Sequence, residues 1–334
     1  MAFQPTFTVT PRLLGELEFI AELRARIASA TIQVSWIPQL QKESRQRGAH
    51  ASTAIEGNPL TLPEVQAIEA GSSLETRSER SQREVLNYFA ALRHVEKNAR
   101  KKVITHEDVL KLHAILAAKV MDQGEAGRYR TIHVRVGRHI APPPEMVSGL
   151  MRELLDWWNK KSAEWSPVLT SAVLHYQFEE IHPFADGNGR AGRMLALWEL
   201  YRRGFDTHHI FSVDEFYWED RPRYYASLAS VSHAEGNLTD WLEYTTEGLR
   251  KTLERVWLRV QKLAAQSGNK KTVLRPKQEH LLHLLRERHG LAPGEIWEAL
   301  DVTKQGAAHI LQPLLKSKLV KRIGTRKNGR YILA

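Results

Sequence analysis

Most of this 334-residue chain repeats its apolar residues at helical spacing, which requires a core built mainly from helices. The ranges 13–29 and 86–97 show the repeat, and Thr105 suits the N-cap of a further helix over 109–121. The stretch 131–141 instead alternates apolar and polar side chains around a Gly-Arg turn, as a β-hairpin does. A plain connector is the alternative there. We therefore predict a mainly α fold with a small hairpin.

Length and composition limit the class of protein. A chain of this size exceeds one ordinary core and predicts two or three domains. It contains no cysteine, which excludes disulfides and thiolate metal sites and favours a reducing compartment. It has neither a signal-like start nor a run of about 18 apolar residues. We expect a cytoplasmic protein with no membrane partner.

The positive charge is concentrated at one end of the chain. From Gly268 to Ala334 there are 14 Lys and Arg against 5 Asp and Glu, so that +9 of the net charge of +10 lies in this segment. A basic terminal module on a nearly neutral body is a common layout for a nucleic-acid-binding appendage. A docking domain whose lysines merely face water would look the same.

One run of twelve residues, 182–193, carries an unusual set of chemical groups. It reads His-Pro-Phe-Ala-Asp-Gly-Asn-Gly-Arg-Ala-Gly-Arg and lies between two predicted helices. Its glycines lead into the N-terminus of the second helix, where unpaired amides and the helix dipole favour anions. Arg190 and Arg193 project to the same side of that helix. The run predicts a nucleotide-phosphate site that carries its own base.

Other interpretations of this run explain less. It contains neither the Walker pattern nor a dinucleotide fingerprint after a strand. His175 and His182 are seven residues apart, unlike a His-x3-His zinc pair. A helix corner with a buried histidine and solvated arginines would account for each residue separately, but not for all of them together.

The pattern His-Pro-Phe-x-Asp-Gly-Asn-Gly-Arg-x-x-Arg at 182–193 resembles the signature of the Fic family. The resemblance covers roughly residues 100–248 and includes the hairpin 131–141, which is similar to the family's target-binding flap. Most characterised members transfer AMP from ATP to a protein hydroxyl. The resemblance therefore implies a helical Fic bundle, ATP as substrate with Mg²⁺, and a hydroxyl-bearing protein target that docks on the hairpin.

The resemblance also implies roles for individual residues. His182 is the expected general base, and Asp186 the expected Mg²⁺ ligand. Phe184 is expected to anchor the loop in the core, and Tyr224 or Tyr225 to line the adenine pocket. The complete set expected to bind the nucleotide is Phe184, Asp186, Gly187, Asn188, Gly189, Arg190, Arg193, Tyr224 and Tyr225.

A second motif lies more than a hundred residues upstream. Residues 52–57, Ser-Thr-Ala-Ile-Glu-Gly, fit the family's inhibitory pattern Ser/Thr-x3-Glu-Gly/Asn, on a predicted helix of about 41–57. Together with Ser52 of this motif, Glu56 is expected to inhibit the enzyme by pairing bidentately with Arg193, the arginine that the γ-phosphate needs. An exposed glutamate at a helix end is the alternative.

The C-terminal residues 273–334 resemble a winged helix, which adds an α+β domain to the predicted fold. Thr303 would cap the recognition helix and direct Lys304, Gln305 and His309 toward a DNA groove. Arg326, Lys327 and Arg330 on the wing could meet phosphate. Winged helices also dock proteins or dimerise, and we expect a homodimer.

These observations predict four regions and one preferred function. The regions are an N-terminal helical part (1–100), a Fic catalytic domain (101–248), a helical linker (249–272) and a winged-helix domain (273–334). The preferred function is an autoinhibited protein adenylyltransferase that acts on a target or on itself and releases pyrophosphate. One alternative is a DNA-binding regulator whose Fic module senses nucleotide. The other is a Fic enzyme that removes AMP or transfers phosphocholine, UMP or phosphate. An intact base, carboxylate and arginine pair favour an enzyme.

Overall fold

The computed structural model describes residues 3–30, 36–137, 139–205, 208–266, 275–288, 290–317, 319–324 and 329–333. In these ranges the chain is mainly helical, as predicted, and its strands form two separate two-stranded sheets. The chain divides into two compact units, one of Met1–Ala30 with Leu40–Arg259 and one of Thr31–Gln39 with Val260–Ala334. The candidate site lies wholly in the first unit.

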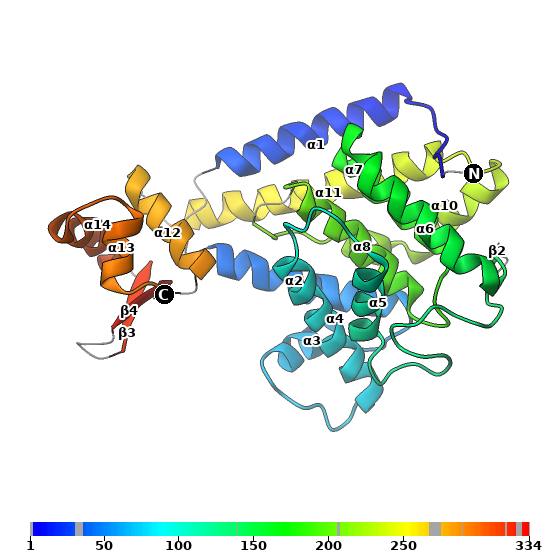
Figure 1. Ribbon diagram of the computed structural model, residues 1–334, viewed down its shortest axis with the longest axis horizontal. Helices are drawn as coiled ribbons and strands as arrows, with labels where there is room; N and C mark the ends of the chain where they lie inside the picture. The colour runs from blue at the N-terminus through cyan, green and yellow to red at the C-terminus, as the bar shows by residue number, and fades with distance from the viewer. Residues whose placement is uncertain are drawn as a thin grey trace. The chain divides into compact units, whose positions relative to one another are not determined.

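The α-helices up to residue 266 are α1 (Pro11–Ser29), α2 (Ile37–Ile55), α3 (Leu62–Glu69), α4 (Glu79–Lys97), α5 (His106–Leu116), α6 (Pro144–Lys160), α7 (Pro167–Ile181), α8 (Asn188–Arg202), α9 (Asp214–Glu219), α10 (Arg221–His233) and α11 (Thr239–Gln266). A 3-10 turn, Ser162–Glu164, precedes α7. In Figure 1, α8 lies in the middle of the first unit, with its most extensive contacts to α7 and further contacts to α4 and α5.

Helices α7 and α8 form the centre of the core, because residues on nearly every side of each helix are buried. Buried residues of α7 include Val173 and Phe178, and those of α8 include Leu195 and Trp198. Helix α8 also buries the charged side chains of Arg190, Arg193 and Glu199 among them. The loop between these two helices is therefore anchored in the core of the unit.

Two helix starts follow the expected capping chemistry. The Ser166 hydroxyl accepts a hydrogen bond from the amide of Val168, with a proline at the first position of α7. Thr105 caps α5 together with Asp108, so the helix begins at His106. The expected cap at Thr105 is confirmed, whereas the predicted end of the helix at residue 121 was wrong. Helix α5 stops at Leu116, and Lys119 soon takes a left-handed φ of 59° that a helix cannot contain.

The predicted hairpin is present but shorter than 131–141. Strand β1 (Arg135–Val136) pairs antiparallel with β2 (His139–Ile140). Gly137 at the turn has a φ of 58°, which suits glycine, and Arg138 lies outside the described residues. Val136 and Ile140 remain 41% and 73% exposed, so the alternation of residue types does not produce a buried face here.

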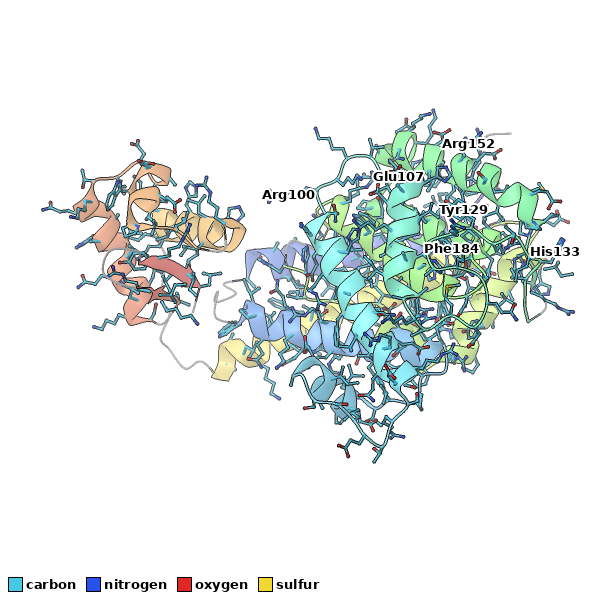
Figure 2. The ribbon with its side chains drawn as sticks, turned by 60° about the horizontal axis from the view of Figure 1, so that its bottom comes forward. Arg100, Glu107, Tyr129, His133, Arg152 and Phe184 are labelled. Carbon is cyan, nitrogen blue, oxygen red and sulfur yellow. The ribbon has the colours of Figure 1, made fainter. Side chains whose placement is uncertain are left out.

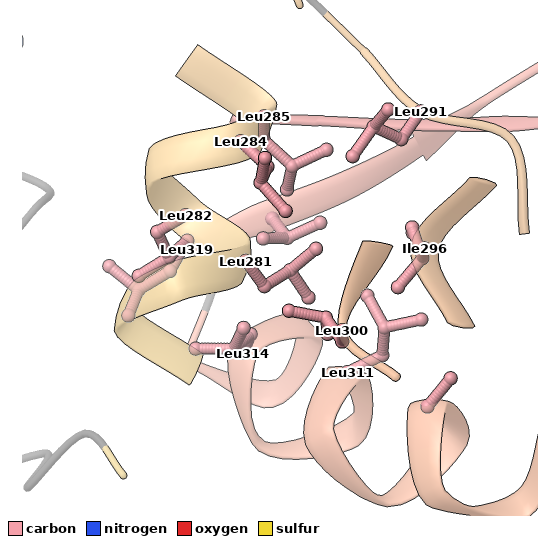
Figure 3. Close-up of a cluster of buried hydrophobic side chains, with 12 residues drawn as sticks. Leu281, Leu282, Leu284, Leu285, Leu291, Ile296, Leu300, Leu311, Leu314 and Leu319 are labelled. Carbon is pink, nitrogen blue, oxygen red and sulfur yellow. The ribbon is translucent and has the colours of Figure 1, made fainter. Parts of the chain in front are cut away.

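The second unit contains α12 (Pro276–Arg288), α13 (Pro293–Ala299) and α14 (Lys304–Lys316), followed by β3 (Val320–Ile323) and β4 (Arg330–Leu333). The strands pair antiparallel, with Val320 opposite Leu333. Figure 3 shows leucine and isoleucine side chains from all three helices filling its core. Three helices and a hairpin in this order make a winged helix, and Thr303 caps α14 through the amide of Gly306.

Helix α11 runs without a break through residue 248, so the expected end of the Fic domain falls inside this helix. Leu249, Leu253 and Val256 continue its buried face beyond that point. The later part of the expected linker, 267–272, lies outside the described residues.

Candidate active site

The candidate site is built on the loop between α7 and α8. Helix α7 ends at Ile181, and His182 follows in the left-handed conformation, with φ 48° and ψ 60°. Gly187, also left-handed, precedes the first residue of α8. A left-handed histidine is uncommon and is held by its surroundings. Residues 182–187 thus form a tight corner at the N-terminus of α8.

Asn188 holds this corner together from within. Its side chain accepts a hydrogen bond of 2.9 Å from the amide of Phe184 and donates one of 2.8 Å to the carbonyl of the same residue. Phe184 itself is fully buried. Figure 2 shows Phe184 beside Tyr129, with ring centroids 5.5 Å apart. Phe184 therefore lies in the core beneath the loop.

His113 of α5 supports the loop from the core side, a role that the sequence did not predict. Its ring stacks on Phe184 with centroids 3.6 Å apart. Its Nδ1 accepts a hydrogen bond from the amide of Gly127, so the hydrogen must be on Nε2, which donates to the carbonyl of Asp186. Burial lowers the pKa of His113 to about 4, which keeps the ring neutral.

Arg130 is a second residue that the sequence did not single out. Its guanidinium donates to the carbonyl of His182 at 2.8 Å and to those of Ile132, Pro142 and Ile181. The side chain is buried. Because Ile132 and Pro142 flank the hairpin, one arginine joins both arms of the hairpin to the backbone of the proposed base.

Arg190 and Asp186 face each other across the first turn of α8. Their closest N–O distance is 3.7 Å, and Arg190 lies equally far from Glu84. Arg190 is buried, yet its Nε and Nη1 make no hydrogen bond to any described residue. Buried donors are rarely left without an acceptor. This arginine is suited to receive an anion.

Asp186 is the residue that could hold a metal ion. Its side chain is about one-third exposed, and one carboxylate oxygen accepts the amide of Gly187 at 2.6 Å. Among the described residues there is no cluster of three potential ligands. A single open carboxylate fits Mg²⁺, which is commonly held by one or two carboxylates together with substrate phosphates.

The second arginine of the motif, Arg193, is engaged by helix α2. Its Nη2 donates to Glu56 Oε1 at 2.7 Å and to the carbonyl of Ser52 at 2.9 Å, while Nε donates to the Ser52 hydroxyl at 3.0 Å. The expected bidentate pair is therefore corrected to a single Glu56–Arg193 hydrogen bond. Ser52, one helical turn before Glu56, accepts from Nε and from Nη2.

Asp214 of α9 lies on the other side of Arg193, 3.7 Å from its Nε. Tyr88 donates to the same carboxylate at 2.9 Å. Burial raises the pKa of Asp214. Burial also disfavours the charge of Arg193, but Glu56 and Asp214 outweigh it and raise the pKa of Arg193. Burial would likewise raise the pKa of Glu56, and the charge of Arg193 reverses this and lowers it.

A cavity of about 490 Å³ opens beside these groups. Its wall includes Glu56, Gly189 and Arg193 together with His182, and both tyrosines expected at the adenine. Tyr225 is 37% exposed, whereas Tyr224 is 1% exposed and lies 3.1 Å from His175 Nε2. Five residues of the expected nucleotide-binding set do not line this cavity: Phe184, Asp186, Gly187, Asn188 and Arg190.

The family relationship follows from a match at this site. A model of the Fic/DOC family matches residues 103–200, a range that contains the whole loop and both arginines. The chain carries a Fic/DOC domain. The match covers helices α5 to α8 and the hairpin, so the Fic domain includes the His113 and Arg130 contacts described above.

Curated relatives of this Fic protein carry the name adenylyltransferase. The chain is 34% identical over 209 residues to protein adenylyltransferase fic-1 of Caenorhabditis elegans, which covers 61% of this chain and 39% of that protein. It is 30% identical over 250 residues to protein adenylyltransferase Fic of Drosophila willistoni, covering 74% and 48%. The chain thus matches less than half the length of these two relatives.

Solved Fic structures resemble the fold. A Fic family protein from Desulfovibrio desulfuricans G20 is 28% identical, with a TM-score of 0.67 over 99% of this chain and 98% of that one. Fic-1 from Caenorhabditis elegans is 27% identical, with a TM-score of 0.64 over 77% and 74%. In the described part of this Fic protein, no helix is both long and apolar enough to cross a membrane.

Proposed function

We propose that this protein transfers AMP from ATP to a Tyr, Ser or Thr hydroxyl of a protein target, which can be the protein itself. The observation that carries the proposal is that His182 and Arg193 face one 490 Å³ cavity at the N-terminus of α8. The names of the curated relatives support the same activity. The hydroxyl oxygen bonds to the α-phosphorus, the bond to the β-phosphate oxygen breaks, and pyrophosphate leaves.

The phosphate groups have matching donors at the N-terminus of α8. The amides of Gly187, Asn188 and Gly189 lie at the positive end of the helix dipole. The Gly187 amide donates to Asp186 in this structure and would have to exchange that carboxylate for a phosphate oxygen. Arg190 offers buried N–H groups without hydrogen bonds among the described residues, and Arg193 adds a second guanidinium. Mg²⁺, held by Asp186 and the phosphates, would neutralise the charge that develops on the leaving group.

His182 is the proposed base of the reaction. Its side chain is 15% exposed and lines the cavity. A histidine can accept the hydroxyl proton near neutral pH as the new bond forms. The left-handed backbone of His182, held by Arg130, keeps the ring at this position.

Glu56 is the proposed inhibitor. Arg193 cannot bind a γ-phosphate and Glu56 at the same time through the same Nη2. ATP that enters while the pair is closed would lack this contact and bind in an unreactive position. We call the state in which Glu56 is bonded to Arg193 the closed state. Ser52 accepts two further hydrogen bonds from Arg193 in this state, so both residues of the motif contribute to it.

The target is proposed to dock on the hairpin. Strands β1 and β2 leave Val136 and Ile140 exposed, and Val136 also lines the cavity. An extended segment paired along such an edge would bring its hydroxyl toward His182.

The absence of cysteine supports a reducing compartment such as the cytoplasm. We also propose a homodimer, which sedimentation can test.

DNA binding by the second unit is a second candidate function. Lys304, Gln305 and His309 are exposed at the start of α14, and Lys321 is exposed on β3. Arg330 instead pairs with Glu295 at 3.2 Å, and Arg326 and Lys327 lie outside the described residues. Salt-dependent binding of a labelled duplex, weakened by Lys304→Ala, would support it. Equal duplex binding by the wild type and by Lys304→Ala would count against a contact between α14 and the DNA groove.

One labelling experiment tests the transferred group. The Glu56→Gly protein is incubated with Mg²⁺ and with ATP labelled at either the α- or the γ-phosphate, using lysate and the protein itself as targets. AMP transfer places only the α label on protein. The γ label alone would indicate a kinase, and no label on any protein would reject the transferase. Release of AMP from a modified target would indicate AMP removal.

A further inference from the structure

Glu179, in the last turn of α7, lies directly behind the proposed base. Its carboxylate Oε2 is 3.6 Å from His182 Nδ1, and its backbone carbonyl is 3.3 Å from the same nitrogen. The two side chains are only 13% and 15% exposed. The backbone carbonyl can only accept a hydrogen bond, and so can the carboxylate when it is ionised. The hydrogen of a neutral His182 ring therefore belongs on Nδ1, which leaves Nε2 as the acceptor.

The other oxygen of the same carboxylate has no competing partner. Glu179 Oε1 is buried and makes no hydrogen bond to any described residue. The neighbouring Glu180 differs, since its carboxylate accepts from Tyr176 at 3.1 Å and lies 3.7 Å from His139. Of these two adjacent glutamates, Glu179 is the one directed at His182.

Gly192 on α8 provides the space for this carboxylate. A Cβ atom at residue 192 would lie 2.5 Å from Glu179 Oε1 and 3.2 Å from Phe178. Contacts of 2.5 Å are too short for real Cβ atoms, so any other residue would displace the glutamate. This glycine occupies one of the variable positions of the motif, and the carboxylate gives it a structural reason.

Other titratable groups surround the pair from several elements. Glu56 directly after α2, Arg193 of α8 and Tyr224 of α10 line the same cavity as His182 and Glu179. Arg190 of α8 does not line the cavity, and it lies 3.7 Å from the carboxylates of Asp186 and Glu84. Arg193 is committed to Glu56, Ser52 and Asp214. His182 is the one cationic partner of Glu179 among the described ion pairs.

We propose that Glu179 is the positioning residue of His182, resting on the function proposed above. It holds the Nδ1–H tautomer, so that Nε2 faces the incoming hydroxyl. When Nε2 takes the hydroxyl proton, the ionised Glu179 stabilises the imidazolium, and no proton leaves Nδ1. A carboxylate that orients a catalytic histidine in this way is a recurrent solution. The distance of 3.6 Å between Glu179 Oε2 and His182 Nδ1 is compatible with this role, because catalytic hydrogen bonds often shorten only when substrate binds.

The test compares Glu179→Gln with Glu180→Gln, both in the Glu56→Gly protein. Glu179→Gln should lower kcat by about 10- to 100-fold and leave KM for ATP nearly unchanged, since only the proton transfer is affected. The pH at which kcat reaches half its maximum should also move. Glu180→Gln should change kcat, and the pH at which kcat is half-maximal, much less than Glu179→Gln does. Thermal unfolding of both variants shows that they fold.

A spectroscopic measurement does not depend on activity. Imidazole ¹⁵N shifts report which ring nitrogen carries the hydrogen. We expect the Nδ1–H tautomer of His182 in the parent and in Glu180→Gln, and a mixture in Glu179→Gln. The Glu179 proposal is overturned if its kcat and tautomer match the parent. If the Glu56→Gly parent itself transfers no label, the proposed function fails, and the tautomer alone then decides the role of Glu179.

Discussion

Arg193 of α8 donates a hydrogen bond of 2.7 Å to Glu56, a residue 137 positions earlier in the chain, at the edge of the cavity that His182 also lines. The same guanidinium is held from α2 by Ser52 and from α9 by Asp214. When Glu56 leaves, Asp214 still compensates the buried charge. The arginine can therefore exchange one carboxylate for a phosphate without losing all of its partners.

Ser52→Ala should activate the enzyme partly. The Ser52 hydroxyl accepts from Arg193 Nε in a buried place, and its loss weakens the closed state by about 1–3 kcal/mol. The Ser52 carbonyl and Glu56 remain bound to Arg193, so the rise in AMP transfer should stay below that of Glu56→Gly. Initial rates of labelling measure both. A Ser52→Ala rate at or below that of the wild type would contradict the contribution of Ser52.

His182→Ala should abolish the chemistry without preventing ATP binding. In the Glu56→Gly background we expect kcat to fall by about 10²- to 10⁴-fold, as loss of a general base does. ATP affinity, measured by calorimetry, should stay nearly the same because the phosphates are held by α8. A variant that loses ATP binding and kcat together would show that His182 has another role.

Arg130→Met should destabilise the unit. The change leaves carbonyls of His182, Ile132 and Pro142 without their donor, which should cost about 2–5 kcal/mol of the free energy of unfolding. Urea unfolding measures the loss. Arg128→Met is the matched control, since Arg128 is 73% exposed and its ion pair with Glu125 should contribute less than about 1 kcal/mol. Equal losses in the two variants would show that Arg130 does not clamp the loop.

Stability should fall in mild acid through His113. Burial lowers its pKa to about 4 from 6.5, so the unfolded chain binds the proton first as the pH drops. The contribution of neutral His113 to the free energy of unfolding is complete above about pH 6.5 and is lost as the pH falls toward 4. Between about pH 7 and pH 5 this residue should account for about 2 kcal/mol. The drop in urea stability should be smaller by that amount in His113→Asn, which does not titrate. Equal drops would contradict the low pKa.

The sequence predicted the parts of the site that are contiguous. His182, the glycines and the two arginines share one loop and one helix turn, so their spacing alone indicates that they meet. The pairing of Glu56 with Arg193 was predicted only through resemblance to a family, because no local pattern links α2 to α8. The second hydrogen bond expected there goes to Ser52, one helical turn earlier.

Three supporting residues could not be predicted in the same way. His113, Arg130 and Asp214 come from α5, the segment before the hairpin and α9, and each looks like an ordinary helix or loop residue in the sequence. Their roles arise from burial next to backbone carbonyls or to Arg193, which only the three-dimensional packing provides. The hairpin shows the opposite case. Its alternation predicted longer strands, but in the described residues only two residues pair on each side, and Val136 and Ile140 stay exposed.

The most direct measurement is the rate at which α-labelled ATP labels protein in wild type, Glu56→Gly, Glu56→Gln and the double variant Glu56→Gly with His182→Ala. Freeing Arg193 should raise the rate by about 10- to 100-fold, the factor expected from a charged hydrogen bond of about 1.5–3 kcal/mol. Glu56→Gln should lie between wild type and Glu56→Gly, and the double variant should fall to background. Equal rates for wild type and Glu56→Gly would contradict inhibition through Arg193.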